Sequence, residues 1–260
     1  MNAAADPLPT SPRVVAVIQA RMTSTRLPGK VLEPIGDRSL LAWCVAGVRA
    51  VPDVATIVVA TTTEPQDDPL VEAAAALGVE VHRGPVFDVL TRCFGAVAPF
   101  EPELVLRQTA DNPFPDPWVA AAQIRAVLGG LDYIGIAGWP IGIASEVCRM
   151  DAFTTAMHEA TAAAEREHVM PFLYRHPERF DIGALPRFAP LPAGGERWRY
   201  TVDTPADLEL ARALAKRLGH GPPVSLAELE AFMAAEPDLG LLNADVVQKP
   251  WQVAQATEGR

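Results

Sequence analysis

The loop formed by residues 19–30 gathers positive charge directly after an apolar stretch. Arg21, Arg26 and Lys30 lie within ten residues, with hydroxyl side chains such as Ser24 between them. Guanidinium, ammonium, hydroxyl and loop N–H groups together can bind a polyphosphate. The spacing GxxxxGK[ST] is absent, so this is not a Walker A loop. The alternative is a surface loop whose cations form salt bridges with acidic neighbours.

Two aspartates come at the ends of predicted strands. Asp111 follows the apolar run 103–109, and Asp203 ends the run 197–203. Carboxylates at the carboxyl ends of strands in one sheet can hold Mg²⁺ (or Mn²⁺) together with phosphate oxygens. Asp203 can equally be the N-cap of the helix that follows, and Asp111 can belong to a turn. A polyphosphate needs both cationic side chains and a metal, so the basic loop favours the metal site.

Composition excludes several classes of protein. The chain has 260 residues and a net charge of -10, which argues against a nucleic-acid partner that needs a broad basic face. The three cysteines, Cys44, Cys93 and Cys148, fit neither a disulfide scaffold nor a zinc site. No apolar run approaches the roughly 20 residues that cross a bilayer. We expect a cytoplasmic protein with no membrane segment, in which residues 1–12 form a disordered tail.

Strand and helix patterns alternate through the first half of the chain. They predict an α/β fold with a three-layer, mainly parallel sheet, in one domain over 13–260. In such sheets ligands bind beyond the carboxyl ends of the strands, where the basic loop and both aspartates lie. The predicted strands are 14–20, 56–63, 79–82, 103–109 and 197–203, and the predicted helices are 38–50, 67–78, 85–98, 151–163, 166–175, 204–218 and 225–235.

The run QARMTSTRLPGK resembles the signature loop of the cytidylyltransferase family that includes CMP-sugar-acid synthetases, especially the spore coat polysaccharide biosynthesis protein F branch. Similar matches follow in VVATTTEPQDDPLVE, RGPVFDVLTRC, RQTADNP, EREHVMPFLYRHPERF, TVDTPADLEL and LLNADVVQK. The resemblance implies a nucleotide-diphosphosugar-transferase (Rossmann-like) fold with a small inserted acceptor or dimerisation lobe at about 138–195. It implies a homodimer that transfers CMP from CTP to a sugar acid or related acceptor and releases pyrophosphate, for surface glycan or natural-product biosynthesis.

The resemblance also implies roles for particular residues. Arg21 and Lys30 would be catalytic, and Asp111 and Asp203 would hold Mg²⁺ (or Mn²⁺). The nucleotide would be bound by Gln19, Ala20, Arg21, Ser24, Arg26, Lys30, Thr61 and Thr109, and the acceptor by Gly142, Glu146, Glu167 and His168. His168 can be a general base or a group that contacts the substrate. Glu146 can bind the acceptor or pair across a dimer.

Three positions depart from the family pattern. Thr23 and Ala110 stand where glycine is usual, and Asn112 replaces a frequent cysteine. An added side chain narrows the approach of a backbone to phosphate. Two alternatives therefore stay open: a nucleotidyltransferase that uses another nucleotide or a sugar phosphate, and a nucleotide-binding protein without turnover. A glycosyltransferase fits less well, because Asp111 is followed by Asn-Pro rather than by a DxD motif.

Overall fold

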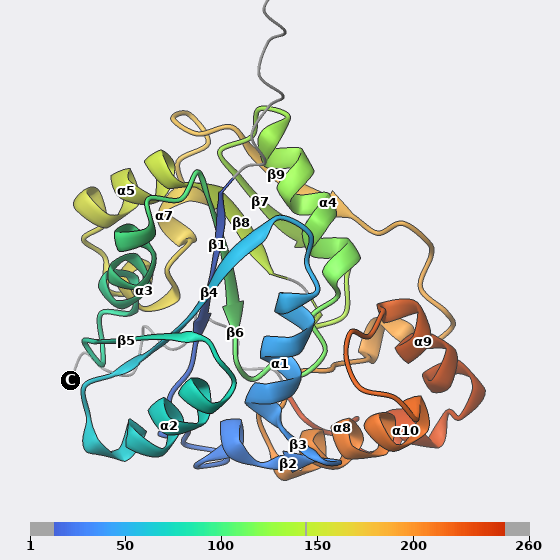
Figure 1. Cartoon of the computed structure of the whole chain (residues 1–260). Coiled ribbons are helices and arrows are strands. Elements are labelled where there is room, and N and C mark those ends of the chain that lie inside the picture. The colour runs from blue at the N-terminus through green and yellow to red at the C-terminus, as the bar shows by residue number, and fades with distance from the viewer. Residues whose placement is uncertain (1–12, 144, 248–260) are drawn as a thin grey trace, which may run out of the picture.

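A seven-stranded sheet forms the centre of the protein (Figure 1). The structure is a computed structural model that describes residues 13–143 and 145–247. Among the described residues the strand order is β5-β4-β1-β6-β8-β7-β9, and β8 alone runs antiparallel to its neighbours. The mainly parallel α/β sheet is therefore confirmed. The strands are β1 (Val14–Gln19), β4 (Val54–Thr62), β5 (Glu80–Gly84), β6 (Leu104–Thr109), β7 (Tyr133–Ala137), β8 (Glu146–Arg149) and β9 (Ile182–Pro186).

Helices cover both faces of this sheet, as the three-layer prediction requires. One face packs against α1 (Leu40–Arg49), α2 (Asp68–Ala76) and α4 (Pro117–Leu128). The other face packs against α3 (Val89–Val97), α5 (Met150–Glu159) and α7 (Pro171–Tyr174), and α6 (Ala163–His168) packs against α3 and α7. Strand β1 is buried on both faces of the sheet, as its run of apolar residues predicts. Its alternate residues Val14, Ala16 and Ile18 pack toward α1, α2 and α4, and Val15 and Val17 pack toward the opposite helices.

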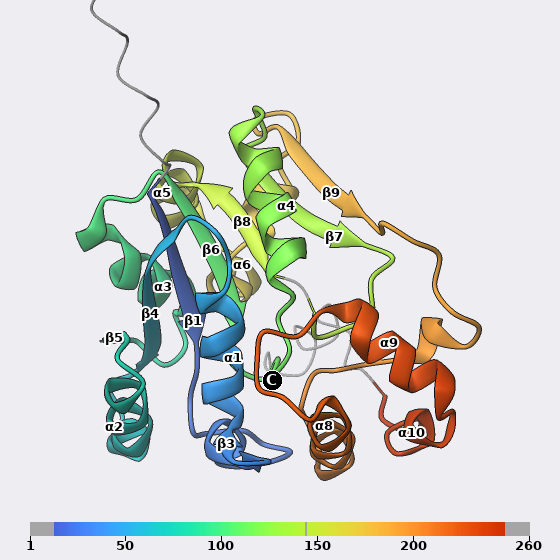
Figure 2. The same cartoon turned by 45° about the vertical axis from the view of Figure 1, so that its right-hand side comes forward.

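A separate apolar cluster lies beside the sheet, around the C-terminal helices (Figure 2). These helices are α8 (Pro205–Leu218), α9 (Leu226–Ala235) and α10 (Asp238–Leu241). Trp43, Phe114 and Val202 join this cluster. The hairpin of β2 (Pro34–Ile35) and β3 (Arg38–Ser39) leads from the basic loop into α1 and adds Ile35 to it. The cluster therefore ties the C-terminal helices to the segment that follows the basic loop.

Four predicted elements differ from the structure. The predicted helix 85–98 begins only at Val89, because the side chain of Asp88 caps it there by accepting the N–H of Thr91. Residues 197–203 form no strand, and Arg199 makes an isolated bridge with Ile141. The reason is that the N–H groups of Tyr200 and Val202 donate to the loop carbonyls of Ile141 and Asp111 instead of to a strand of the sheet. The predicted helix 166–175 is broken into α6 and α7, because Val169 adopts a positive φ of 76°. The predicted helix 151–163 ends at Glu159, where α5 ends.

The segment 138–195, in which we expected an acceptor lobe, contributes β8 and β9 to the sheet and α5–α7 to one of its faces. The tail predicted at 1–12 and the residues from 248 onward lie outside the described residues. Within 13–143 and 145–247, no helix has both the length and the apolar character that crossing a membrane would need.

Candidate active site

The basic loop folds back so that its lysine points inward. The N–H of Gly29 donates to the carbonyl of Met22 at 2.8 Å, and Gly29 has a φ of 74°, which favours glycine. Lys30 follows at the start of a short 3₁₀ helix (Lys30–Leu32) and is only 8% exposed. The turn therefore buries an ammonium group beneath the carboxyl ends of β1 and β6.

Lys30 brings the two predicted metal ligands together. Its Nζ lies 3.0 Å from Oδ2 of Asp111 and 2.9 Å from Oδ1 of Asp203, and it donates to the carbonyl of Val202 at 2.7 Å. Residues 30, 111 and 203 are far apart in sequence, so their meeting is a result of the fold. The predicted convergence of both aspartates beside the basic loop is present in the structure.

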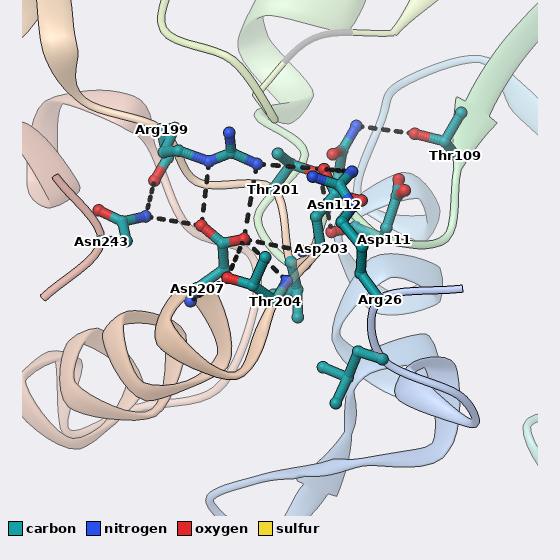
Figure 3. Close-up of polar contacts among 12 residues, drawn as sticks. Arg26, Thr109, Asp111, Asn112, Arg199, Thr201, Asp203, Thr204, Asp207 and Asn243 are labelled. Atoms are coloured by element: carbon teal, nitrogen blue, oxygen red, sulfur yellow. Dashed lines mark hydrogen bonds and ion pairs between the residues drawn. The ribbon is translucent and has the colours of Figure 1, made fainter. Parts of the chain in front are cut away.

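Asp203 is surrounded by cations on its other side as well (Figure 3). Its Oδ2 lies 3.0 Å from Arg26 and 3.1 Å from Arg199. Burial raises the pKa of Asp203, but Lys30, Arg26 and Arg199 together outweigh it and lower the pKa below its ordinary value. Asp203 is therefore ionised at neutral pH, with both oxygens engaged.

These contacts answer two of the alternatives that the sequence left open. Arg26 and Lys30 do form salt bridges, as the surface-loop alternative predicts, but with the two aspartates proposed as metal ligands. Arg21 is exposed and makes no ion pair with any residue that the structure describes. Asp203 is not the cap of α8, because Thr204 is its N-cap, with Oγ1 accepting from the N–H of Asp207 at 3.3 Å.

Asp67 supports the basic loop from below, a role that sequence reasoning missed. The sequence predicts Asp67 as the acidic first residue of the helix 67–78. In the structure Asp67 is only 1% exposed and accepts the N–H of Met22 at 2.7 Å. Thr61 donates to it at 2.9 Å, and both the N–H and the hydroxyl of Thr62 donate as well. Burial raises the pKa of Asp67, but these hydrogen bonds outweigh it and lower the pKa.

Asp67→Asn should loosen the basic loop. An amide offers one acceptor oxygen and turns two N–H donors toward groups that already donate, so we expect the free energy of unfolding to fall by about 1–3 kcal/mol. A carboxylate whose pKa is lowered by folding stabilises the protein at pH values above its ordinary pKa. This contribution is lost as the pH falls through the pKa of the folded state. The difference from wild type, measured by urea denaturation, should therefore shrink below about pH 4. An unchanged unfolding free energy at pH 7 would contradict this role; Asp68→Asn, at the exposed neighbour, is the control.

The remaining predicted nucleotide residues lie around the loop. Ala20 is buried, and its N–H donates to the carbonyl of Ala60 at 3.1 Å, while Oγ of Ser24 accepts from the N–H of Leu27 at 3.3 Å. Thr61 is fully buried under the loop, with its hydroxyl on Asp67. In this structure these groups shape the loop; their contact with a nucleotide stays a prediction.

A pocket of about 570 Å³ lies beside Thr109, two residues before Asp111. Its polar wall is an ion pair between Arg107 and Glu146, and Tyr133 donates its hydroxyl to Glu146 at 2.6 Å. Burial lowers the pKa of Arg107, but the carboxylate of Glu146 outweighs it and raises the pKa. Glu146 lines this pocket, and neither Asp111 nor Asp203 does; the binding of an acceptor by Glu146 stays a prediction.

Arg107 also fixes the orientation of Gln19. Its Nε and one terminal nitrogen donate to Oε1 of Gln19 at 3.0 and 2.8 Å, which leaves the amide nitrogen of Gln19 as the group available to donate. Arg107 was not among the residues we singled out. An arginine within an otherwise apolar strand is the signal that could have pointed to it.

The other predicted acceptor residues fall into two groups. Glu167 is exposed and His168 is half-buried, both at the end of α6. Burial lowers the pKa of His168, Glu167 acts in the opposite direction and Arg107 adds to the lowering, so the imidazole is mainly neutral at pH 7. Gly142 instead has a structural reason to be glycine: its φ is 99°, and a Cβ there would lie 2.3 Å from the N of Thr201.

The three departures from the family pattern cause no backbone strain. Neither Thr23 nor Ala110 has a positive φ, so neither position requires glycine for its conformation. Ala110 is buried, and Asn112 donates from Nδ2 to Oγ1 of Thr109 at 3.0 Å (Figure 3). Asn112 thus takes part in the turn that carries Asp111.

Comparisons with known proteins agree with this geometry. The spore coat polysaccharide biosynthesis protein SpsF of Bacillus subtilis is 35% identical over 86% of this chain and 95% of its own length. The 3-deoxy-manno-octulosonate cytidylyltransferase of Chelativorans sp. is 31% identical over 77% of this chain and 96% of its own. Both relatives are covered almost completely, so the similarity is not confined to one motif.

Solved structures show the same fold. A cytidylyltransferase from Leptospira borgpetersenii superposes with a TM-score of 0.82 at 24% identity, covering 92% of this chain and 99% of that one. A CMP:2-keto-3-deoxy-manno-octonic acid synthetase in complex with CTP gives a TM-score of 0.62 at 19% identity, covering 79% and 99%. The sequence model of the cytidylyltransferase family matches residues 15–246, which confirms the resemblance seen in the sequence: the chain belongs to the cytidylyltransferase family.

Proposed function

We propose that this protein transfers the CMP unit of CTP to an oxygen of a sugar acid, with release of pyrophosphate, in the biosynthesis of a polysaccharide. An oxygen of the acceptor attacks the α-phosphorus of CTP in line, and the bond from that phosphorus to the pyrophosphate oxygen breaks. Membership of the family and the names of the relatives support the choice of CTP and of a sugar acid. The observation that carries the proposal is the loop that sets Arg26 and Lys30 against Asp111 and Asp203.

The protein's part in this reaction is to position the substrates and to neutralise charge. Arg21, which is exposed and outside any ion pair with the described residues, is available to meet the triphosphate first. Arg26 and Lys30 would exchange their carboxylate partners for phosphate oxygens. Lys30 would then stabilise the negative charge that builds on the leaving pyrophosphate.

Asp111 and Asp203 fit a site for Mg²⁺. Both already converge on one cationic centre, the ammonium of Lys30, within 3.0 Å. Mg²⁺ in nucleotide enzymes is held by one or two carboxylates together with phosphate oxygens. Within the described ranges no group of three or more His, Cys, Asp or Glu side chains could hold a metal, so phosphate would have to complete the ligand set. When bound, Mg²⁺ (or Mn²⁺) supplies charge neutralisation at the reacting phosphate.

The acceptor would occupy the pocket beside Thr109. Glu146, held by Arg107 and Tyr133, can accept a hydrogen bond from an acceptor hydroxyl, and the neutral imidazole of His168 is able to take a proton. A homodimer, which the resemblance implies, is proposed as well and can be measured by light scattering of the purified protein.

Pyrophosphate release with each nucleoside triphosphate and a panel of acceptors tests the proposal. We expect turnover with CTP and Mg²⁺ and a sugar acid such as 3-deoxy-manno-octulosonate, and none without acceptor. Turnover with another nucleotide in place of CTP would support the wider nucleotidyltransferase alternative. CTP binding in a thermal-shift assay without turnover on any acceptor would support a binding protein instead.

A further inference from the structure

A C-terminal residue is hydrogen-bonded to the groups that hold Asp203 in place. Asn243 follows α10 and is 4% exposed. Its Nδ2 donates to Oδ1 of Asp207 at 2.9 Å and to the carbonyl of Arg199 at 3.3 Å (Figure 3). Asn243 thus connects the end of the described chain to the segment that carries Asp203.

Asp207 holds that segment at several points. Its side chain is fully buried, and its Oδ2 accepts the N–H groups of Asp203 and Thr204 at 3.0 and 2.9 Å and the hydroxyl of Thr204 at 2.9 Å. Its Oδ1 lies 3.0 Å from Nε of Arg199. One carboxylate therefore fixes both the backbone at Asp203 and the guanidinium that contacts the Asp203 side chain.

The two oxygens of Asp203 differ in their partners. Oδ2 contacts Arg199, whose other end is tied to Asp207 and whose side chain is 5% exposed, so this contact does not depend on the basic loop. Oδ1 contacts Lys30, which the proposed reaction needs at the phosphates. If Lys30 and Arg26 exchanged their contacts with Asp203 for phosphate oxygens, Arg199 would keep Oδ2 in place and Oδ1 would become the oxygen open to a cation.

We infer that Asn243, acting through Asp207 and Arg199, positions the Asp203 carboxylate for the metal–nucleotide complex. This inference rests on the proposed function and adds the C-terminal segment to the apparatus of the site. Asn243 is a positioning residue, because among the described residues its side chain hydrogen-bonds to Asp207 and to the Arg199 backbone and not to Asp203. Groups that orient metal ligands typically contribute 10–100-fold to metal affinity or activity.

The test separates the positioning of Asp203 from the anchoring of the tail. Asn243→Leu keeps a similar volume and removes both hydrogen bonds. The main readout is calorimetric: the ratio of the CTP affinity with Mn²⁺ to the CTP affinity with EDTA, measured without acceptor. We expect Asn243→Leu to lower this ratio and kcat by about tenfold, with the EDTA affinity unchanged. Leu241→Ala is the matched control, since Leu241 belongs to α10 and is 69% exposed.

The milder variant Asn243→Ser, whose hydroxyl is too short for the contact with Asp207, is measured alongside and decides the question if Asn243→Leu does not fold. The inference is overturned if the folded variant keeps the wild-type ratio and loses only unfolding free energy, because Asn243 then merely anchors the tail. If the wild-type protein shows no effect of Mn²⁺ on CTP affinity, the proposed function loses its metal site. The two failures are therefore distinguishable.

Discussion

Asp203→Asn should lower turnover with CTP by on the order of 10²–10³-fold while the protein still folds. The amide has almost the shape of the carboxylate, and its neighbours keep other partners. Lys30 retains Asp111 and the Val202 carbonyl, and Arg199 retains Asp207. The negative charge proposed to hold the metal is lost, so the chemical step should suffer more than the binding of CTP without metal.

The same variant makes a prediction about pH. Arg26 and Arg199 would face a neutral amide, so the free energy of unfolding at pH 7 should fall by about 1–3 kcal/mol. Because the folded pKa of Asp203 is lowered, its carboxylate stabilises the protein above the ordinary value of 3.8, and the effect is lost as pH falls through the folded value. The stability difference, measured by urea denaturation, should shrink as pH falls below about 4.

Asp37→Asn is the matched control for these measurements. Asp37 is 84% exposed in the β2–β3 hairpin, and its contact with Arg38 is long, at 3.7 Å. It should behave as wild type in both turnover and stability. Undiminished turnover of Asp203→Asn with Mg²⁺ would contradict the metal assignment, whatever its effect on stability.

The meeting of the basic loop with Asp111 was predictable, because parallel strands end at one edge of a sheet. Buried strands before the loop and before Asp111 are strong local signals, and β1 and β6 pair directly in the structure. The run 197–203 was a weaker basis for predicting the position of Asp203. Its alternate residues Trp198, Tyr200 and Val202 pack in the C-terminal cluster, and Asp203 reaches the site from a segment that forms no strand.

Roles that depend on distant partners could not be predicted from local patterns. Asp67 looks like a helix-starting carboxylate in sequence, and only the fold places it under Met22, 45 residues away. Asn243 lies 36 residues from Asp207, and nothing in its own neighbourhood points to that contact. Helix α4 was missed although Asp116 and Pro117 are a regular N-cap and first residue, because its many alanines give little apolar periodicity.

The cationic and acidic side chains of the site pair with one another. Asp111 and Asp203 lie against Lys30, and Arg26 and Arg199 complete the charge balance on Asp203. A triphosphate with its metal offers new partners to both sets at once, phosphates to the cations and a cation to the carboxylates. Binding is then an exchange of ion pairs, so neither a bare nucleotide nor a bare metal should bind as well as the two together.

Lys30→Met should separate the binding of phosphate by the cationic side chains from the binding of a metal by the two carboxylates. Methionine keeps an unbranched chain and removes the ammonium that two carboxylates share, so Asp111 and Asp203 face each other with less compensation. Removing one partner of a buried ion pair lowers the free energy of unfolding by about 3–5 kcal/mol. We expect a loss near the lower figure, because Arg26 and Arg199 still compensate the charge of Asp203. Turnover should fall on the order of 10²–10³-fold, because the ammonium proposed to stabilise the phosphates is lost.

The response to Mg²⁺ distinguishes this account from simple damage to the core. Without Lys30 the two carboxylates have room and charge for a divalent cation, so Mg²⁺ should raise the midpoint of thermal unfolding more in Lys30→Met than in wild type. Lys216→Met, at an exposed position of α8, removes the same charge elsewhere and should match wild type. If Mg²⁺ shifts the midpoint equally in all three proteins, Asp111 and Asp203 do not form one cation site. A larger shift in Lys30→Met alone shows that its ammonium and the metal compete for the same carboxylates.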